Sequence, residues 1–184
     1  IVPRGGRVSG TSSVVQFDAW NWEDAAIKAD DGIHMNWPTS IAFGRWWMGE
    51  DPGAKLNPNY AKNVEELNKY MNTAKNYLNS AMSPKNLELG AMKVLFDKTQ
   101  TLFMHVDGER EITDAVEFAL KHNVKLVVVG ASGADKVADL LLKNKIPVVI
   151  KRAHLVPGND DDNYDKSYKT AMHLVDKGLT ITIG

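Results

Sequence analysis

Strand and helix segments alternate along the second half of the chain, and this alternation constrains the fold more than any other feature of the sequence. Four short apolar segments have strand character, and the segments between them have helical character. The expected strands are 101–108, 124–130, 146–150 and 179–184, and the expected helices are 109–122, 134–144 and 163–177. Strands that alternate with helices in this way typically form a parallel sheet.

The carboxyl ends of these strands are the expected functional edge of the molecule, because parallel α/β sheets carry their chemistry there. His105 lies near the end of the first expected strand, Gly130 ends the second, and Lys151 follows the third. We expect these three residues and their immediate successors to lie along one edge. The chain ends at Gly184 with the last strand, where a protein of this kind would next supply a site residue.

The first half of the chain has a different character. Residues 1–58 contain all five tryptophans, together with many Gly, Asn, Asp and Pro residues, and they show little periodicity. We expect loops and short elements that pack by burying aromatic rings. A short strand is expected at 12–17, and one or two helical turns are expected at 22–28.

Residues 59–97 are expected to be helical. Apolar residues recur at spacings of three and four from 59 to 82, which predicts a long helix with one core-facing stripe. A proline at position 84 ends this helix, because proline disfavours helical conformation in the residue before it, and a second helix is expected at 86–96. The apolar stripe comprises Val64, Leu67, Met71, Ala74, Leu78 and Ala81.

These regions predict a single α/β domain or domain fragment over 1–184, with an irregular part at 1–58, helices at 59–97 and βα units at 98–184. Crossovers between parallel strands are right-handed in nearly all cases, so strands added one after another place every helix on one face of the sheet. In a closed (β/α)8 barrel of about 250 residues the other face is the packed interior. With four βα units visible, we expect about half of a TIM barrel; an open doubly wound sheet is the alternative.

Composition excludes several classes of function. The chain has 22 basic and 23 acidic residues and a net charge of -1, which gives no basic excess for nucleic acid or an anionic membrane. No apolar run approaches the roughly 20 residues of a membrane-spanning helix. Cysteine is absent, which excludes disulfides, zinc knuckles and a thiol nucleophile. The chain begins at Ile1 and shows no signal peptide.

His105 is the first candidate site residue. At the carboxyl end of a strand an imidazole can ligate a divalent metal or act as a general base. The alternative is a buried histidine that is hydrogen-bonded within the fold. One histidine cannot form a zinc site by itself, because such a site needs at least three protein ligands.

Two further candidates follow the next strands. The turn Gly130–Ala134 opens a helix, and its backbone N–H groups could face an anion or substrate; the alternative is a tight βα turn. Lys151, Arg152 and His154 follow the third strand and could hold a carboxylate or phosphate. Their alternative is a set of solvated loop charges.

Two polar segments are less specific. The acidic run 160–165 lacks the glycine and the final glutamate of a calcium loop, so we expect capping of the helix that follows. The segment 18–38 combines acidic, histidine and tryptophan residues, as stacking platforms do, but we favour a tryptophan-rich loop core. His122 and His173 lie in expected helices and are interpreted as packing or surface residues.

Taken together, these motifs resemble the amidohydrolase superfamily, in the branch related to imidazolonepropionase. The resemblance covers most of the chain. The segments 6–13 and 20–24 resemble a part that precedes the later barrel strands, and 157–165 resembles a loop after the seventh strand. The segments 102–108, 130–134 and 179–184 resemble the fifth, sixth and eighth strands.

The resemblance implies a fragment of a metal-dependent TIM barrel that hydrolyses amide or other C–N bonds, often cyclic and not peptidic. His105 matches the family's metal-binding histidine of the fifth strand, whereas Gly130 stands where the family has a second histidine. The His-x-His pair of the first strand and the final aspartate are absent. We therefore expect a divalent metal, zinc above all, in a full-length parent, and no activity of this fragment alone.

Several alternatives stay open at this point. The leading expectation places Lys151, Arg152 and His154 near the substrate, with Gly130 beside them, and assigns no catalytic residue. The alternative is a non-catalytic α/β domain that binds a small anion through the same edge. A third is a degenerate barrel kept for subunit assembly.

The expected partners are a small-molecule substrate, no nucleic acid and no membrane. The bare sheet face also predicts a homo-oligomer or association through that face. The residues do not reveal the compartment, and relatives in this branch are often exported, so the resemblance leaves a periplasmic or secreted parent open.

Overall fold

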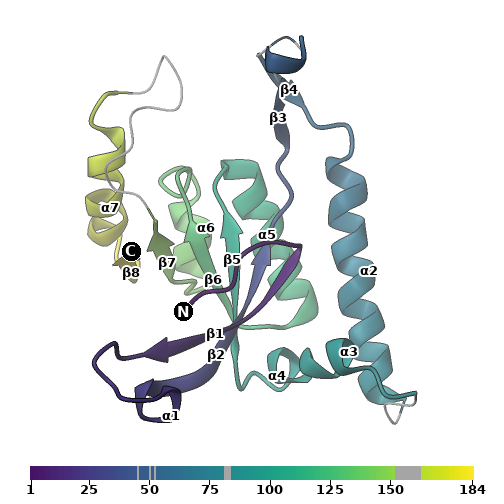
Figure 1. Ribbon diagram of the computed structural model, residues 1–184. Coiled ribbons are helices and arrows are strands. Elements are labelled where there is room, and N and C mark those ends of the chain that lie inside the picture. The colour runs from purple at the N-terminus through teal and green to yellow at the C-terminus, as the bar shows by residue number, and fades with distance from the viewer. Residues whose placement is uncertain (45, 50, 52, 81–83, 152–162) are drawn as a thin grey trace.

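A computed structural model of the 184-residue chain describes residues 1–44, 46–49, 51, 53–80, 84–151 and 163–184. The centre of the molecule is a six-stranded sheet with strand order β1-β2-β5-β6-β7-β8 (Figure 1). Within this sheet the strands β2, β5, β6, β7 and β8 are parallel to one another, and β1 is antiparallel to β2. Their bounds are β1 Val8–Val15, β2 Ala26–Asn36, β5 Thr101–Val106, β6 Leu126–Gly130, β7 Val148–Ile150 and β8 Ile181–Ile183.

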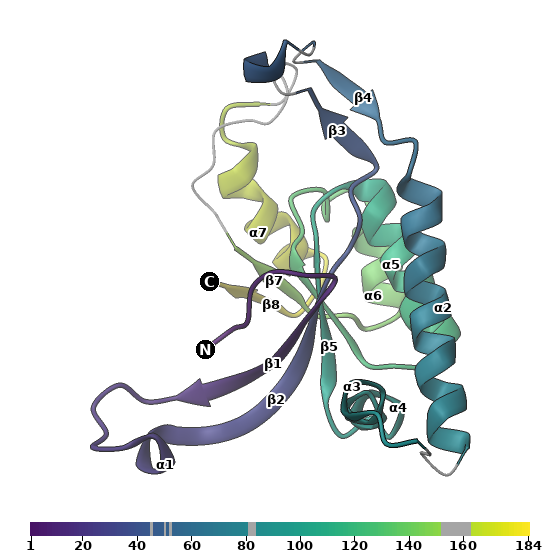
Figure 2. The ribbon, with the colours of Figure 1, turned by 45° about the vertical axis from the view of Figure 1, so that its right-hand side comes forward.

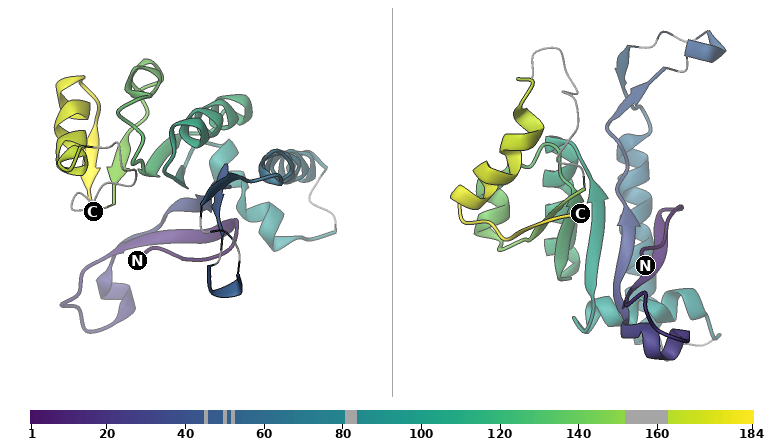
Figure 3. Two further views of the ribbon diagram at one scale, coloured as in Figure 1. Left: turned by 90° about the horizontal axis from the view of Figure 1, so that it is seen from above. Right: turned by 60° about the vertical axis from the view of Figure 1, so that its left-hand side comes forward.

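The order of the parallel strands follows the chain without reversal, which excludes the doubly wound alternative. Figure 3 shows the helices that follow the strands gathered on one side of the sheet, as right-handed crossovers in a half barrel require. The main helices are α2 Tyr60–Asn79, α5 Glu109–His122, α6 Ala138–Lys143 and α7 Lys166–Asp176.

Smaller elements complete the chain. A hairpin of β3 Ile41–Phe43 and β4 Ala54–Leu56 extends away from the rest of the fold (Figure 2). The remaining elements are α1 Trp22–Ala25, the 3₁₀ helix η1 Trp46–Met48, α3 Leu87–Ala91 and α4 Lys93–Phe96. No helix among the described residues is long and apolar enough to cross a membrane.

The core lies between the sheet and its helices. Side chains alternate along β5, so that Leu102, Met104 and Val106 are buried while the residues between them are only partly buried. The buried set packs against apolar residues of α5 such as Ile112 and Val116. The other set, which includes His105, therefore lies on the face that no crossover helix covers.

The expected stripe on α2 is confirmed at Leu67, Met71 and Ala74, which are buried. Val64 and Leu78 are partly buried, and Ala81 lies outside the described residues. The second helix, expected at 86–96, is instead divided into α3 and α4 at Met92. The βα units of the second half occur where the alternation predicts them, with strands two or three residues shorter than expected.

The first 58 residues differ most from the prediction. They are not mainly irregular, because β1 and the eleven-residue strand β2 lie there, and β2 is part of the parallel sheet. Among the tryptophans whose side chains the structure describes, Trp37 buries its ring in the core, and Trp20, Trp22 and Trp47 are at least two-thirds exposed. The expectation that this region packs by burying tryptophan rings is therefore wrong for these three residues.

Candidate functional site

Two histidines from neighbouring strands meet on the uncovered face. His34 of β2 lies beside Phe103 of β5 in the register of the parallel pair. Their rings stack with centroids 4.8 Å apart and an interplanar angle of 6°. This stacking directs Nδ1 of His34 toward His105, two residues further along β5, and the distance to its Nε2 is 2.8 Å. The two imidazoles therefore form a hydrogen bond.

Lys151 joins this pair from a strand that is not adjacent to β5. It directly follows β7, and β6 lies between β7 and β5. Its Nζ lies 2.6 Å from Nδ1 of His105, so its side chain extends across the end of β6. The structure thus brings together His105 and Lys151, two of the residues expected at this edge, and adds His34.

The ammonium group fixes the direction of the whole hydrogen-bonded chain. An ammonium can only donate, so Lys151 donates to Nδ1 of His105 and the proton of that imidazole is on Nε2. The Nε2–H group of His105 then donates to Nδ1 of His34. His34 consequently carries its own proton on Nε2, at the end of the chain.

The end of this chain is a buried donor. His34 is only 4% exposed, and its Nε2 has no hydrogen-bond partner among the described residues. An unpaired buried donor destabilises a fold by about 1–3 kcal/mol. The contacts of His34 with Phe103 and His105 therefore hold its ring in place, although the unpaired donor is unfavourable.

Electrostatics favour the neutral form of both histidines. Burial is the main cause that lowers the pKa of His105, to about 4, and the positive charge of Lys151 and the neighbouring His34 lower it further. The pKa of His34 is lowered by burial and by Lys151, with Asp31 acting in the opposite direction. His105 is therefore an acceptor for Lys151 at neutral pH.

The low pKa of His105 predicts a loss of stability in acid. Between about pH 6.5 and pH 4 the unfolded chain binds a proton at this residue that the folded chain does not, so the free energy of unfolding falls as the pH falls. We expect His105→Gln to remove about 2 kcal/mol of the difference in stability between pH 7 and pH 4.

The measurement is urea unfolding of both proteins at several pH values. His34 and His122 also have lowered pKa values, so a shallower residual slope remains in the variant. Identical slopes in the two proteins would mean that His105 titrates normally.

Gly130 lies at the end of β6, where it accommodates Asp107. Its φ is +107°, and a Cβ atom there would lie 2.6 Å from Oδ1 of Asp107 and 3.0 Å from the carbonyl oxygen of Val106. The turn after it packs on the same loop, since the N–H of Gly133 donates to the Asp107 carbonyl oxygen at 2.8 Å. This is the tight βα turn that was one of the two expectations. A substrate contact at Gly130 stays a prediction.

The remaining expected residues either lie outside the described part of the chain or have no contact with this cluster. Arg152, His154 and the aspartates at 160–162 lie outside the described residues. Asp165 occupies the N-cap position of α7, but its side chain forms no capping hydrogen bond and pairs with Lys169 instead. The expectation that the acidic run caps this helix is therefore wrong for Asp165.

A second polar cluster attaches the end of β2 to α5. Both the N–H and the hydroxyl group of Ser40 donate to Oε1 of Glu111, at 2.8 and 2.6 Å. Burial alone would raise the pKa of Glu111, but the two hydrogen bonds outweigh it and the pKa lies below its ordinary value. The hydroxyl of Tyr60 donates to Asp114 at 2.5 Å in the same region. These contacts hold the backbone after His34 against the helix that follows His105.

Sequence reasoning missed His34 because strand β2 was not expected. A signal for it is present in the sequence: the apolar residues Ile33 and Met35 alternate with Gly32, His34 and Asn36, which is the period-two pattern of a strand. The aromatic and acidic residues around it obscured this pattern. The contact between His105 and Lys151 could not be predicted, because it depends on the reach of a side chain across a strand.

Comparison with known proteins identifies the fold. No protein-family model matches the chain, and no curated protein matches it. Among solved structures, an amidohydrolase from Thermotoga maritima is similar, with a TM-score of 0.73 and 20% sequence identity. The match covers 96% of this chain and 47% of that one, so the chain spans about half the length of this relative. The fold is therefore a mostly parallel α/β sheet that matches half of an amidohydrolase barrel.

Proposed function

We propose that the chain is part of the barrel domain of an amidohydrolase-like enzyme, which hydrolyses a non-peptide amide or another C–N bond, cyclic bonds included. The observation that carries this proposal is the chain of hydrogen bonds from Lys151 through His105 to His34 at the carboxyl edge of the parallel strands. Sheets of this class carry their chemistry at that edge. The similarity to half of the Thermotoga amidohydrolase supports the same proposal. Within the amidohydrolases, we propose the branch related to imidazolonepropionase.

The metal expected for such an enzyme does not fit His105 in this arrangement. Zinc binds a histidine nitrogen at about 2.0–2.1 Å. Nε2 of His105 already has a nitrogen of His34 at 2.8 Å, and Nδ1 has the Lys151 ammonium at 2.6 Å. An ion on either nitrogen would have to displace one of these neighbours. The described residues also contain no group of three or more His, Cys, Asp or Glu side chains that could hold a metal.

The residues themselves can contribute to hydrolysis. When water attacks the carbonyl carbon of an amide, negative charge develops on the carbonyl oxygen, and a fixed cation stabilises that charge. The Lys151 ammonium is such a cation, since its hydrogen bond to His105 holds it at the edge of the sheet.

The test of this function is an assay of hydrolysis with a panel of lactams, hydantoins and N-acyl amino acids, in which the released amine or carboxylate is measured. We expect the 184-residue chain alone to act at background rates and the full-length protein that contains it to be active. Replacing His105 by Gln in the full-length protein removes the imidazole that holds the Lys151 ammonium and should lower kcat/KM by about 100-fold. A full-length protein that hydrolyses none of these substrates, or one that is indifferent to His105→Gln, would contradict the proposal.

A second candidate function is a non-catalytic domain that binds a small anion, and the cation at Lys151 favours it. It predicts stabilisation by ligand without any metal, and binding that survives His105→Ala. Hydrolysis that depends on His105 separates the two functions.

A further inference from the structure

Because the neighbours of His105 leave no room for a metal ion on either ring nitrogen, the positive charge at this site has a different source. We propose that the Lys151 ammonium takes the place of a metal ion at this site, and that the site binds the carboxylate or another small oxyanion of the substrate directly on Lys151. This inference deepens the proposed function by naming an anionic substrate, and it rests on that function. It requires that Lys151 be held in place, that it be free to bind an anion, and that its neighbours do not repel one.

Lys151 is held in place from a rigid part of the fold. Lysine side chains normally sample many rotamers, and the entropy lost on ordering one opposes binding. Here the ammonium is anchored on His105, which is bonded to His34, and His34 is stacked on Phe103. Lys151 itself remains exposed, so a ligand from solution can reach it.

The ammonium retains donors for an anion. It has three N–H donors, and one is used by His105. No carboxylate of the described residues forms an ion pair with Lys151, although other lysines pair with acids throughout the same residues. A carboxylate or phosphate oxygen can therefore accept from it in a charge-assisted hydrogen bond.

The neighbours of Lys151 match this role. His105 is kept neutral by burial, so it accepts from the ammonium and does not add a second charge that would repel it. A divalent metal on Nδ1 of His105 would have to take the place of the ammonium, because this nitrogen has one lone pair and already accepts from Lys151 at 2.6 Å. The arrangement therefore favours one cation and one anion.

The first experiment is calorimetric titration of the 184-residue chain with acetate and with inorganic phosphate at pH 7 and low ionic strength, where screening is weak. We expect binding at one site in the wild type. Lys151→Met and Lys151→Gln should each weaken binding by about 10-fold or more, because a charge-assisted hydrogen bond is lost. Gln retains a donor for His105, so this variant separates charge from anchoring. Lys151→Arg should retain binding within about threefold.

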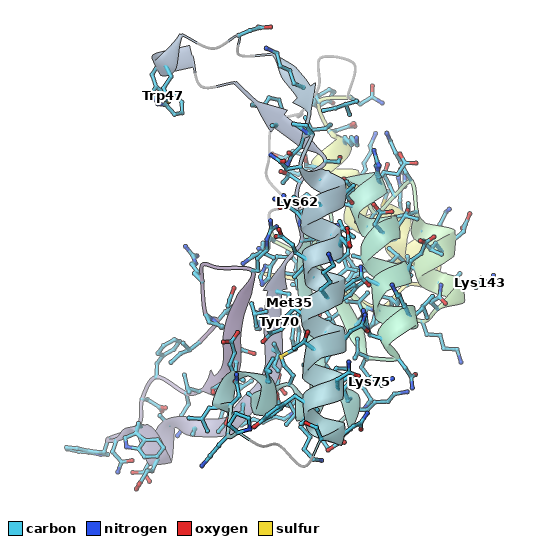
Figure 4. The ribbon with its side chains drawn as sticks, turned by 90° about the vertical axis from the view of Figure 1, so that its right-hand side faces the viewer. Met35, Trp47, Lys62, Tyr70, Lys75 and Lys143 are labelled. Carbon is cyan, nitrogen blue, oxygen red and sulfur yellow. The ribbon has the colours of Figure 1, made fainter. Side chains whose placement is uncertain are left out.

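The matched control is Lys143→Met, since Lys143 lies on α6 and its side chain points away from the fold (Figure 4). This variant should bind both anions like the wild type. Circular dichroism of each variant establishes that it is folded. Absence of binding in the wild type, or equal binding by the wild type and both uncharged variants at position 151, would overturn the proposal.

The second experiment is titration of the metal-free wild type with zinc chloride. We expect no stoichiometric zinc site that depends on His105. Zinc bound at one equivalent and lost in His105→Ala would overturn the inference that Lys151 replaces the metal. Neither experiment uses turnover, so anion binding by the chain without hydrolysis by the full-length protein would reject the proposed function and leave only the anion site on Lys151 standing.

Discussion

Replacing Gly130 with alanine is expected to lower the free energy of unfolding by about 3 kcal/mol. Two effects add. A φ of +107° is unfavourable for a residue with a Cβ atom, and such strained positions destabilise a fold by about 1–3 kcal/mol. The new Cβ would also lie 2.6 Å from Oδ1 of Asp107 and 3.0 Å from the Val106 carbonyl oxygen, and overpacking of this kind destabilises a fold by about 1–3 kcal/mol.

Urea unfolding followed by circular dichroism measures this effect. The matched control is Gly90→Ala, because Gly90 lies in α3 with no atom within 4 Å of an added Cβ; alanine there should be neutral or stabilising by up to about 1 kcal/mol. Asp107→Gly should relieve part of the loss when combined with Gly130→Ala, while the backbone strain remains. Equal stability of Gly130→Ala and the wild type would contradict both the positive φ of residue 130 and the position of Asp107 beside it.

Replacing Met104 with alanine is expected to lower the free energy of unfolding by a similar amount, about 3 kcal/mol. Met104 is fully buried in the central strand β5. Its neighbours in the register are Met35 and Val128, which are also fully buried. Truncation leaves a cavity between the sheet and the helices, and the rigid strands on both sides limit its collapse.

Met172→Ala is the matched control for Met104→Ala. Met172 lies on α7 and is 55% exposed, so the same truncation should change stability by less than about 0.5 kcal/mol. Both variants are compared by urea unfolding at pH 7. A small loss for Met104→Ala, similar to that of the control, would mean that the sheet and helices do not pack into one core at this position.

The second half of the chain could be predicted from its sequence, because one period governs each segment. Apolar strands flanked by helical segments leave little choice of element, and the right-handed crossover leaves little choice of topology. The half barrel follows from these two constraints. The helix at 109–122 has the expected bounds. Gly108 precedes it and Asn123 follows it in the left-handed conformation, and both residues are ordinary signals of a helix end.

The first half could not be predicted in the same way. Strand β2 combines buried residues such as Ile33 with exposed ones such as Asp30, because only its second half pairs with β5. A pattern that changes along one strand has no single period. The tryptophans were misleading for a related reason: Trp20 lies in the connection between two strands of a hairpin, with no neighbouring element to bury it.

The site was only partly predictable. The position of His105 follows from the rule that functional residues lie at the carboxyl ends of parallel strands. Its partners do not follow from that rule. His34 depends on the register between β2 and β5, and Lys151 depends on a contact across β6. The predicted association through the bare sheet face is independent of these contacts and stays a prediction.

Nitrogen NMR of the histidine rings at pH 7 tests the central claim most directly, with His105→Gln and His34→Gln used for assignment among the five histidines. The hydrogen-bonded chain predicts that His34 and His105 are both neutral with the proton on Nε2, and that a scalar coupling connects Nε2 of His105 with Nδ1 of His34. In Lys151→Met the proton of His105 is no longer confined to Nε2, so its ring signals should change while those of His122 do not. A charged His105 at pH 7, or a proton on its Nδ1, would show that Lys151 does not donate to it and would contradict the site described above.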